Sequence, residues 1–336
     1  MLSSILGVDQ RVTFFRELAT LVNSGVSIGE GLSILQTRPG RPELRAAIAD
    51  AAKRVSYGER FSDVMAEHPK MFSALNLAMI AAGEEGGRLD EMLNEVADYL
   101  EKEQELRRML SRETFYPKVL IGAVIFIPLI AQMVIAGVMA GAGAAMAVGL
   151  KALAGYLVFF LAIAALWFAY RKYRETDQGA RNIDRAKLSI PVLGAVISQL
   201  AWAKICRAIG ALYKAGVSTA QALELAGPAS GNRALEATLT QAIPHVQKGV
   251  PLSEALTKSG YIPDLPLRML QTGEKTGDID ATMEKVAEHF EAQSRTSIQR
   301  MAILIVPIAV VIMGVVVLLM AASAYGGYFD ALLDSQ

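Results

Sequence analysis

Three long segments without a charged residue constrain the fold of this chain more than any other feature. They occupy residues 119–150, 152–170 and 301–329. A helix needs roughly 20 apolar residues to cross the hydrocarbon core of a bilayer, and uncharged runs of this length are rare in water-soluble folds. Hydrophobic residues also make up 53% of the chain, above the roughly 45–50% of a typical soluble domain. We therefore predict three transmembrane helices, at 119–140, 152–170 and 301–323.

The lysine and arginine residues near these segments predict their orientation. Basic residues cluster before the first segment, after the second and before the third, whereas Lys151 stands alone between the first two and none follows the third. Because basic loops stay on the cytoplasmic side, we expect residues 1–118 and 171–300 in the cytoplasm. The short loop 141–151 and the tail 324–336 are then external. The sequence predicts a multi-pass protein of the inner (plasma) membrane with a cytoplasmic N-terminus and an external C-terminus.

The two predicted cytoplasmic segments are copies of one another. They align at a constant offset, with a one-residue deletion part-way along. The repeat is longer than the roughly 20–50 residues of a solenoid unit, so we interpret it as a duplicated domain that leads into a membrane segment in each copy. The motif residues that match between the copies are our candidate partner-interface positions: Arg16, Gly25, Gly83, Glu84 and Gly87 in the first copy, and Arg207, Gly216, Gly273, Glu274 and Gly277 in the second.

Each copy has the sequence pattern of a helical bundle. Apolar residues recur at helical spacing, and no stretch shows the alternation of a strand. The predicted fold is an all-α membrane protein with two homologous six-helix cytoplasmic bundles and three transmembrane helices. In the first copy we expect helices near residues 9–24, 28–37, 42–57, 61–67, 73–85 and 89–113.

Local signals mark several of these helix ends. Ser27 followed by Glu30 fits a capping box, in which side chains bond the free backbone N–H groups at a helix start. Ser218 and Gln221 predict the same box in the second copy. Asp90 stands where a first helical turn begins, and there the helix dipole favours negative charge.

The sequence contains no recognisable catalytic or metal-binding constellation. The three histidines lack a partner at metal-ligand spacing, and Cys206, the single cysteine, lies in an apolar helical pattern without a neighbouring base. The formal net charge is zero, so no basic field attracts nucleic acid. We predict a protein that is not an enzyme, needs no cofactor or metal and binds no nucleic acid.

An acidic cluster between residues 84 and 105 leaves three interpretations open. It is either a solvated helix face or a docking face for a basic partner. A bound divalent cation is a third, minor alternative. Glu84 has a counterpart in Glu274, and the two Gly-Glu-x-x-Gly turns equally fit a partner site or a structural corner between helices.

These motifs resemble the type II secretion system F-domain family. The resemblance rests on Phe14-Phe15-Arg16-Glu17-Leu18-Ala19-Thr20-Leu21, on Ser24-Gly25-Val26-Ser27 and on Ala82-Gly83-Glu84-Glu85-Gly86-Gly87-Arg88-Leu89. It covers nearly the whole chain, including the duplication and the three apolar segments.

The resemblance implies an inner-membrane platform, or scaffold, protein of a type II secretion system. Such a protein couples a cytoplasmic assembly ATPase to pseudopilin polymerisation for protein secretion. The implied partners are that ATPase, pilin or pseudopilin subunits, other inner-membrane platform proteins and further copies of the same chain. A type IV pilus assembly platform is the alternative, and a membrane transporter component is a third hypothesis.

Overall fold

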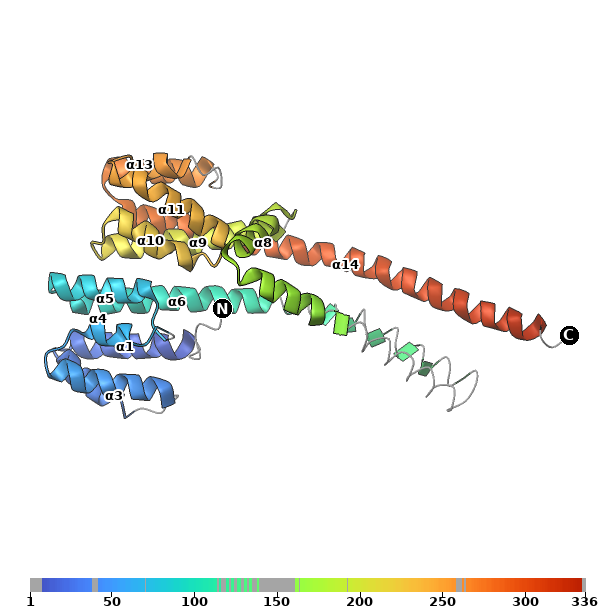
Figure 1. The fold of residues 1–336 in the computed structure, drawn as a ribbon, viewed down its shortest axis with the longest axis horizontal. Helices are drawn as coiled ribbons and strands as arrows, with labels where there is room; N and C mark the ends of the chain where they lie inside the picture. Colours follow the sequence, from blue (N-terminus) through green and yellow to red (C-terminus); the bar gives the residue numbers. More distant parts are fainter. Residues whose placement is uncertain are drawn as a thin grey trace. The chain divides into compact units, whose positions relative to one another are not determined.

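The computed structural model describes residues 8–113 and 161–333, together with scattered positions of 115–138. Within those ranges, residues 38–41, 70, 163, 192, 258–261 and 263 are not described. The described residues form helices and turns without a strand, which confirms the all-α prediction (Figure 1). The chain divides into two compact units: Met1–Met109 with Asp184–Ser294, and Leu110–Ile183 with Arg295–Gln336.

The first copy contains the six helices that its sequence predicts, with bounds that differ by at most two residues. Each apolar period ends where a turn signal begins, and these signals fix the boundaries. The helices are α1 (Val8–Asn23), α2 (Ile28–Leu35), α3 (Pro42–Ser56), α4 (Phe61–Ala66), α5 (Ala74–Gly86) and α6 (Leu89–Glu113).

The second copy repeats this order in the same unit after a preceding helix, α8 (Asp177–Ser189). Its last helix continues without a break into the third apolar segment, although Pro307 lies inside it. The helices are α9 (Leu193–Lys214), α10 (Thr219–Ala229), α11 (Arg233–Gln247), α12 (Leu252–Thr257), α13 (Asp264–Thr276) and α14 (Ile279–Leu333).

The two predicted capping boxes have different outcomes. The Ser27 side chain accepts a hydrogen bond from the backbone N–H of Glu30 at 3.3 Å, which confirms the serine half of the box predicted for the start of α2. At the start of α10, Ser218 has the same extended backbone but its side chain makes no cap hydrogen bond, so this prediction was wrong. The hydroxyl of Thr219, the next residue, instead bonds Tyr213 of α9 across the turn. Asp90 lies in the first turn of α6 as predicted, and Asp280 occupies the first turn of α14.

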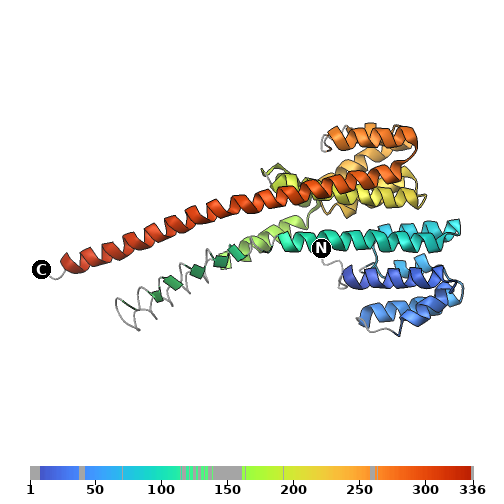
Figure 2. The same ribbon diagram turned by 180° about the vertical axis from the view of Figure 1, so that it is seen from behind.

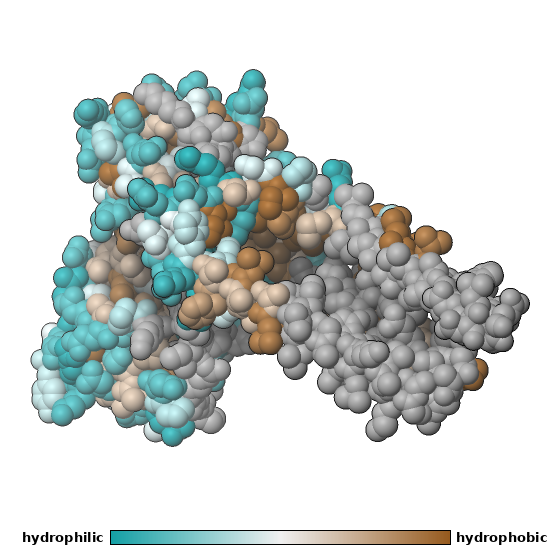
Figure 3. Space-filling model, turned by 45° about the vertical axis from the view of Figure 1, so that its right-hand side comes forward, coloured by the Kyte–Doolittle hydropathy of each residue, from teal (hydrophilic) through white to brown (hydrophobic). Residues whose placement is uncertain are grey.

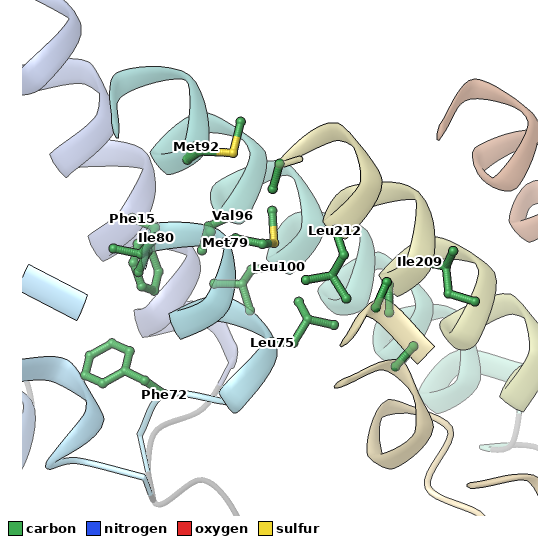
Figure 4. Close-up of a cluster of buried hydrophobic side chains, with 14 of the residues drawn as sticks. Phe15, Phe72, Leu75, Met79, Ile80, Met92, Val96, Leu100, Ile209 and Leu212 are labelled. Atoms are coloured by element: carbon green, nitrogen blue, oxygen red, sulfur yellow. The ribbon is translucent and has the colours of Figure 1, made fainter. Parts of the chain in front are cut away.

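One hydrophobic core runs through both copies. Phe15, Phe72 and Leu100 of the first copy and Ile209 and Leu212 of the second are all at most 1% exposed and belong to the same cluster (Figure 4). Trp202 of the second copy, 1% exposed, belongs to it too. Figures 1 and 2 show α5 and α6 beside α9 and α10. Hydrophilic side chains cover much of the visible surface of the helical unit, on the left of Figure 3. The burial of apolar surface between the copies therefore stabilises them as one compact unit.

The second unit exposes large apolar side chains over its described part. Val138 is 83% exposed, Leu166 72% and Leu318 70%. The predicted loop 141–151 lies outside the described residues, as do many positions of the predicted spans 119–140 and 152–170. The predicted span 301–323 lies within α14, for which only part of the side chains is described.

Among the described residues, one helix, α9, is long and apolar enough to cross a bilayer, but most of its apolar segment is buried in the helical core. A buried core helix of a water-soluble unit has the same length and composition. The three spans and their orientation therefore stay predictions.

Candidate partner-interface motifs

Glu84 caps a neighbouring helix. Its carboxylate accepts hydrogen bonds from the backbone N–H groups of Phe61, at 2.6 Å, and Ser62, at 3.2 Å, and from the Ser62 hydroxyl. These groups begin α4, whose own N-cap residue, Arg60, provides no side-chain hydrogen bond. A carboxylate at a helix N-terminus satisfies free donors and interacts favourably with the helix dipole. Glu84, only 14% exposed, therefore fastens α4 to α5.

Glu274 does the same in the second copy. It accepts hydrogen bonds from the backbone N–H of Ser253, at 3.2 Å, and from the Ser253 hydroxyl at the start of α12. Ser62 and Ser253 are themselves equivalent positions of the repeat. Of the two interpretations that the sequence left open for these glutamates, the geometry favours the structural corner. Sequence reasoning missed both serines, although their matched offset could have indicated them.

The motif glycines allow the helices at this corner to approach closely. A Cβ atom on Gly83 would lie 2.6 Å from Cγ of Met92, and one on Gly273 would lie 2.5 Å from Oγ1 of Thr282. Real Cβ atoms do not come this close to other heavy atoms, so only glycine fits without a shift. Gly87, directly after α5, has a φ of +64°, the left-handed conformation that commonly ends a helix.

The structure brings four of the five first-copy motif residues to one cleft. This open cleft of about 450 Å³ is lined by Gly25, Gly83, Glu84 and Gly87, and also by Asp90. In the second copy a cleft of about 670 Å³ lies over α12 and α13. Glu274 lines it, but the other four motif residues of the second copy do not. The two corners thus share a framework and differ in surface.

Arg16 and Arg207 lie apart from these clefts and link the first and last helices of their copies. Arg16 contacts Asp98, at 2.5 Å, and Glu101, at 2.7 Å, and joins α1 to α6. Arg207 is buried and contacts Glu291 and, at 3.6 Å, Glu284, so it joins α9 to α14.

Burial and neighbouring charges shift the pKa values of groups in these two ion-paired clusters. Burial opposes the charged form of Arg207, but hydrogen bonding and attraction to Glu291 and Glu284 outweigh it and raise its pKa. The hydrogen bond from Arg16 lowers the pKa of Glu101. Glu101 and Glu291 occupy equivalent positions of the repeat, which the sequence analysis did not use.

Most of the acidic cluster is paired within the unit. Glu84 caps α4, and nearly all the remaining carboxylates contact a basic side chain, so the cluster presents less net negative charge than its sequence suggests. The recorded pairs are Glu85–Arg60, Glu91–Arg88, Glu95–Lys214, Asp98–Arg16, Glu101–Arg16, Glu103–Arg107 and Glu105–Lys102.

The described residues offer no group of three or more histidine, cysteine or acidic side chains arranged to hold a metal ion. Cys206 is 4% exposed, and burial raises the pKa of its thiol to about 12. A thiol that stays protonated is a poor nucleophile. Cys206 thus serves as a small apolar residue of the core.

Comparison with known proteins identifies the family. The family described as type II secretion system (T2SS), protein F, matches residues 14–137 and 205–326, which are the two copies of the repeat. A type IV pilus assembly protein PilC of Thermus thermophilus is 30% identical over 95% of this chain and 82% of its own length.

Two other relatives, named type II secretion system protein F, have sequence identities of 28–30% to this chain. A type II secretion system protein F of Xanthomonas campestris pv. campestris is 30% identical over 88% of this chain and 76% of its own length. One of Aeromonas hydrophila is 28% identical over 92% of this chain and 82% of its own length. The duplicated family match and these near full-length relatives agree with the motifs, and the chain belongs to the family of type II secretion system protein F.

Proposed function

We propose that this protein is the inner-membrane platform of a type II secretion system, which couples a cytoplasmic assembly ATPase to pseudopilin polymerisation. The observation that carries the proposal is the pair of family matches over both copies. A type IV pilus assembly platform is the alternative, because a type IV pilus assembly protein and a type II secretion system protein F are each 30% identical to this chain. In either role the protein acts as a scaffold rather than as an enzyme.

We also propose that the protein crosses the membrane three times, at 119–140, 152–170 and 301–323. The exposed apolar side chains of the second unit support this, because in water they would be left without a partner. The basic residues beside the spans support cytoplasmic helical bundles and an external C-terminus. Single-cysteine variants at positions 5, 146 and 333 test the orientation by labelling intact cells, and only positions 146 and 333 should react with an impermeant reagent.

The mechanical part of the proposal rests on α14. One helix of 55 residues includes both the last helix of the second copy and the third predicted span. The buried Arg207 ties its first part to α9 through Glu291. We propose that movement of the second copy, driven by the ATPase, reaches the membrane along this helix.

The motif positions remain our proposed contacts for the ATPase, pseudopilins, other platform proteins or further copies of the chain. The cleft at Gly25, Gly83, Glu84 and Gly87 brings four of these positions together. Replacing Glu84 and Glu274 by arginine should weaken copurification with the ATPase. Glu43→Arg, on the exposed face of α3, is the matched control.

Thermal unfolding separates a docking role of Glu84 and Glu274 from their capping role. Loss of copurification at an unchanged melting temperature supports docking. Loss that accompanies a lowered melting temperature assigns the effect to the broken caps. Unchanged copurification contradicts the docking assignment.

Deletion of the gene distinguishes the candidate machines. The secretion proposal expects exported proteins to disappear from the medium while surface pili remain. Loss of pili with normal secretion would instead establish the pilus alternative. The transporter hypothesis predicts solute flux through vesicles that contain the purified protein alone.

A further inference from the structure

The first copy uses one face of α5 and α6 to receive a helix of the second copy. Leu75 is 4% exposed and Met79 fully buried, and both lie beside Leu212 of α9 (Figure 4). At the edge of this contact Lys214 of α9 forms an ion pair with Glu95 of α6. The contact is thus an apolar stripe bordered by a pair of opposite charges.

The equivalent face of the second copy is exposed. The offset that pairs Gly83 with Gly273 also pairs Leu75 with Leu265, Met79 with Met269 and Glu95 with Lys285. Leu265 is 54% exposed, Met269 half-buried and Lys285 exposed. We call Leu265, Arg268, Met269, Lys285 and His289 the α13–α14 face.

The charge on this face differs from that of its counterpart. Lys285 replaces Glu95, and Arg268 replaces Ala78. A helix that packs here as α9 packs on the first copy would bring its position 214 against a lysine instead of a glutamate. Opposite charges favour a partner and like charges exclude it, so the fitting helix carries a carboxylate where α9 carries Lys214.

A second copy of the chain does not supply such a helix. Its α9 is already covered and would place Lys214 against Lys285. Its α1, the repeat equivalent of α9, has Gln10 and Thr20 where α9 has Ala201 and Ala211. Polar side chains at these positions do not match an apolar stripe.

We propose that the α13–α14 face binds a helix of another protein, with an apolar stripe and an acidic side chain opposite Lys285. The contact would reproduce the packing of α9 on the first copy with the charges reversed. This inference goes beyond the platform role and does not depend on which machine the protein serves.

Two fluorescent peptides of residues 199–216 test the proposal against the full chain in detergent micelles. One keeps Lys214 and the other carries Lys214→Glu. Fluorescence anisotropy should show that the acidic peptide binds about tenfold more tightly. Lys285 repels the lysine at position 214 of the first peptide and attracts the glutamate at that position of the second. Lys285→Glu in the protein should reverse this preference, and Leu265→Asp should abolish binding of both peptides.

Matched variants locate the binding on this face. Ile34→Asp changes another exposed apolar residue, 44% exposed on α2, and Lys248→Glu another exposed lysine. Neither should alter the affinity of the acidic peptide. Equal binding of the two peptides, or binding that survives both Leu265→Asp and Lys285→Glu, would overturn the proposal. So would self-association of the chain, measured by light scattering, that depends on Leu265.

Discussion

At the scale of single residues, the family motif of this chain is mainly a set of packing requirements. Gly83 lets α5 and α6 touch, Gly87 ends α5 in a left-handed conformation, and Glu84 caps α4. None of these roles needs a ligand. The same roles recur at Gly273, Gly277 and Glu274, which explains physically why both copies carry the motif.

The close approach at Gly83 yields a prediction. In Gly83→Ala the new Cβ would lie 2.6 Å from Cγ and 2.7 Å from Cβ of Met92, so α5 and α6 must separate. Overpacking of this kind typically costs ~1–3 kcal/mol. We expect a lower melting temperature for the loss of helical circular dichroism.

Gly86→Ala is the matched control for Gly83→Ala. A Cβ there meets only the flexible Arg88 side chain, at 3.7 Å, and alanine favours the helix over glycine. Its melting temperature should stay equal or rise. If Gly83→Ala were as stable as Gly86→Ala, the glycine would not be required by helix packing.

At the scale of helices, the sequence predicted the boundaries because they depend on local chemistry. Turn glycines, first-turn acidic residues and apolar spacing all act within a few residues of each helix end. The cap that Glu84 provides to α4 was not predictable, because its partners Phe61 and Ser62 become neighbours only when α4 and α5 pack. For the same reason the partners of Arg16 and Arg207 came only from the structure.

Ser27 and Ser218, the residues that precede α2 and α10, provide a test at this scale. Ser27→Ala removes the hydrogen bond to the backbone N–H of Glu30 and should lower the free energy of unfolding by about 0.5–1 kcal/mol. Ser218→Ala removes no cap hydrogen bond and should change it by less than about 0.5 kcal/mol. Denaturant unfolding of both variants measures the difference. Equal losses would mean that Ser218 also caps its helix.

At the scale of the whole molecule, the repeat was visible in the sequence but its packing was not. Apolar periodicity shows that a helix face is buried and cannot show against which helix. The buried side of α9 packs against helices of the second copy and against α5 of the first, so one core crosses the boundary between the copies. A duplication in sequence therefore does not imply two independently folding bodies.

A shared core predicts that damage to the first copy loosens the second. Phe72 is 1% exposed and packs edge-to-face on Phe15, with ring centroids 5.8 Å apart, so Phe72→Ala should cost about 3–5 kcal/mol. Cys206, in the second copy, reports opening there, because its thiol is buried and its pKa is raised to about 12. Alkylation therefore requires unfolding around it.

If the copies open together, Phe72→Ala should speed alkylation of Cys206 by about two to three and a half orders of magnitude, since each 1.4 kcal/mol of the ~3–5 kcal/mol cost shifts the open population tenfold. Tyr57→Ala, at an 81% exposed position of the first copy, should leave the rate unchanged. Loss of helical signal from Phe72→Ala without faster alkylation would mean that the copies unfold separately. Faster alkylation would show that the core between α5 and α9 transmits a perturbation of one copy to the other.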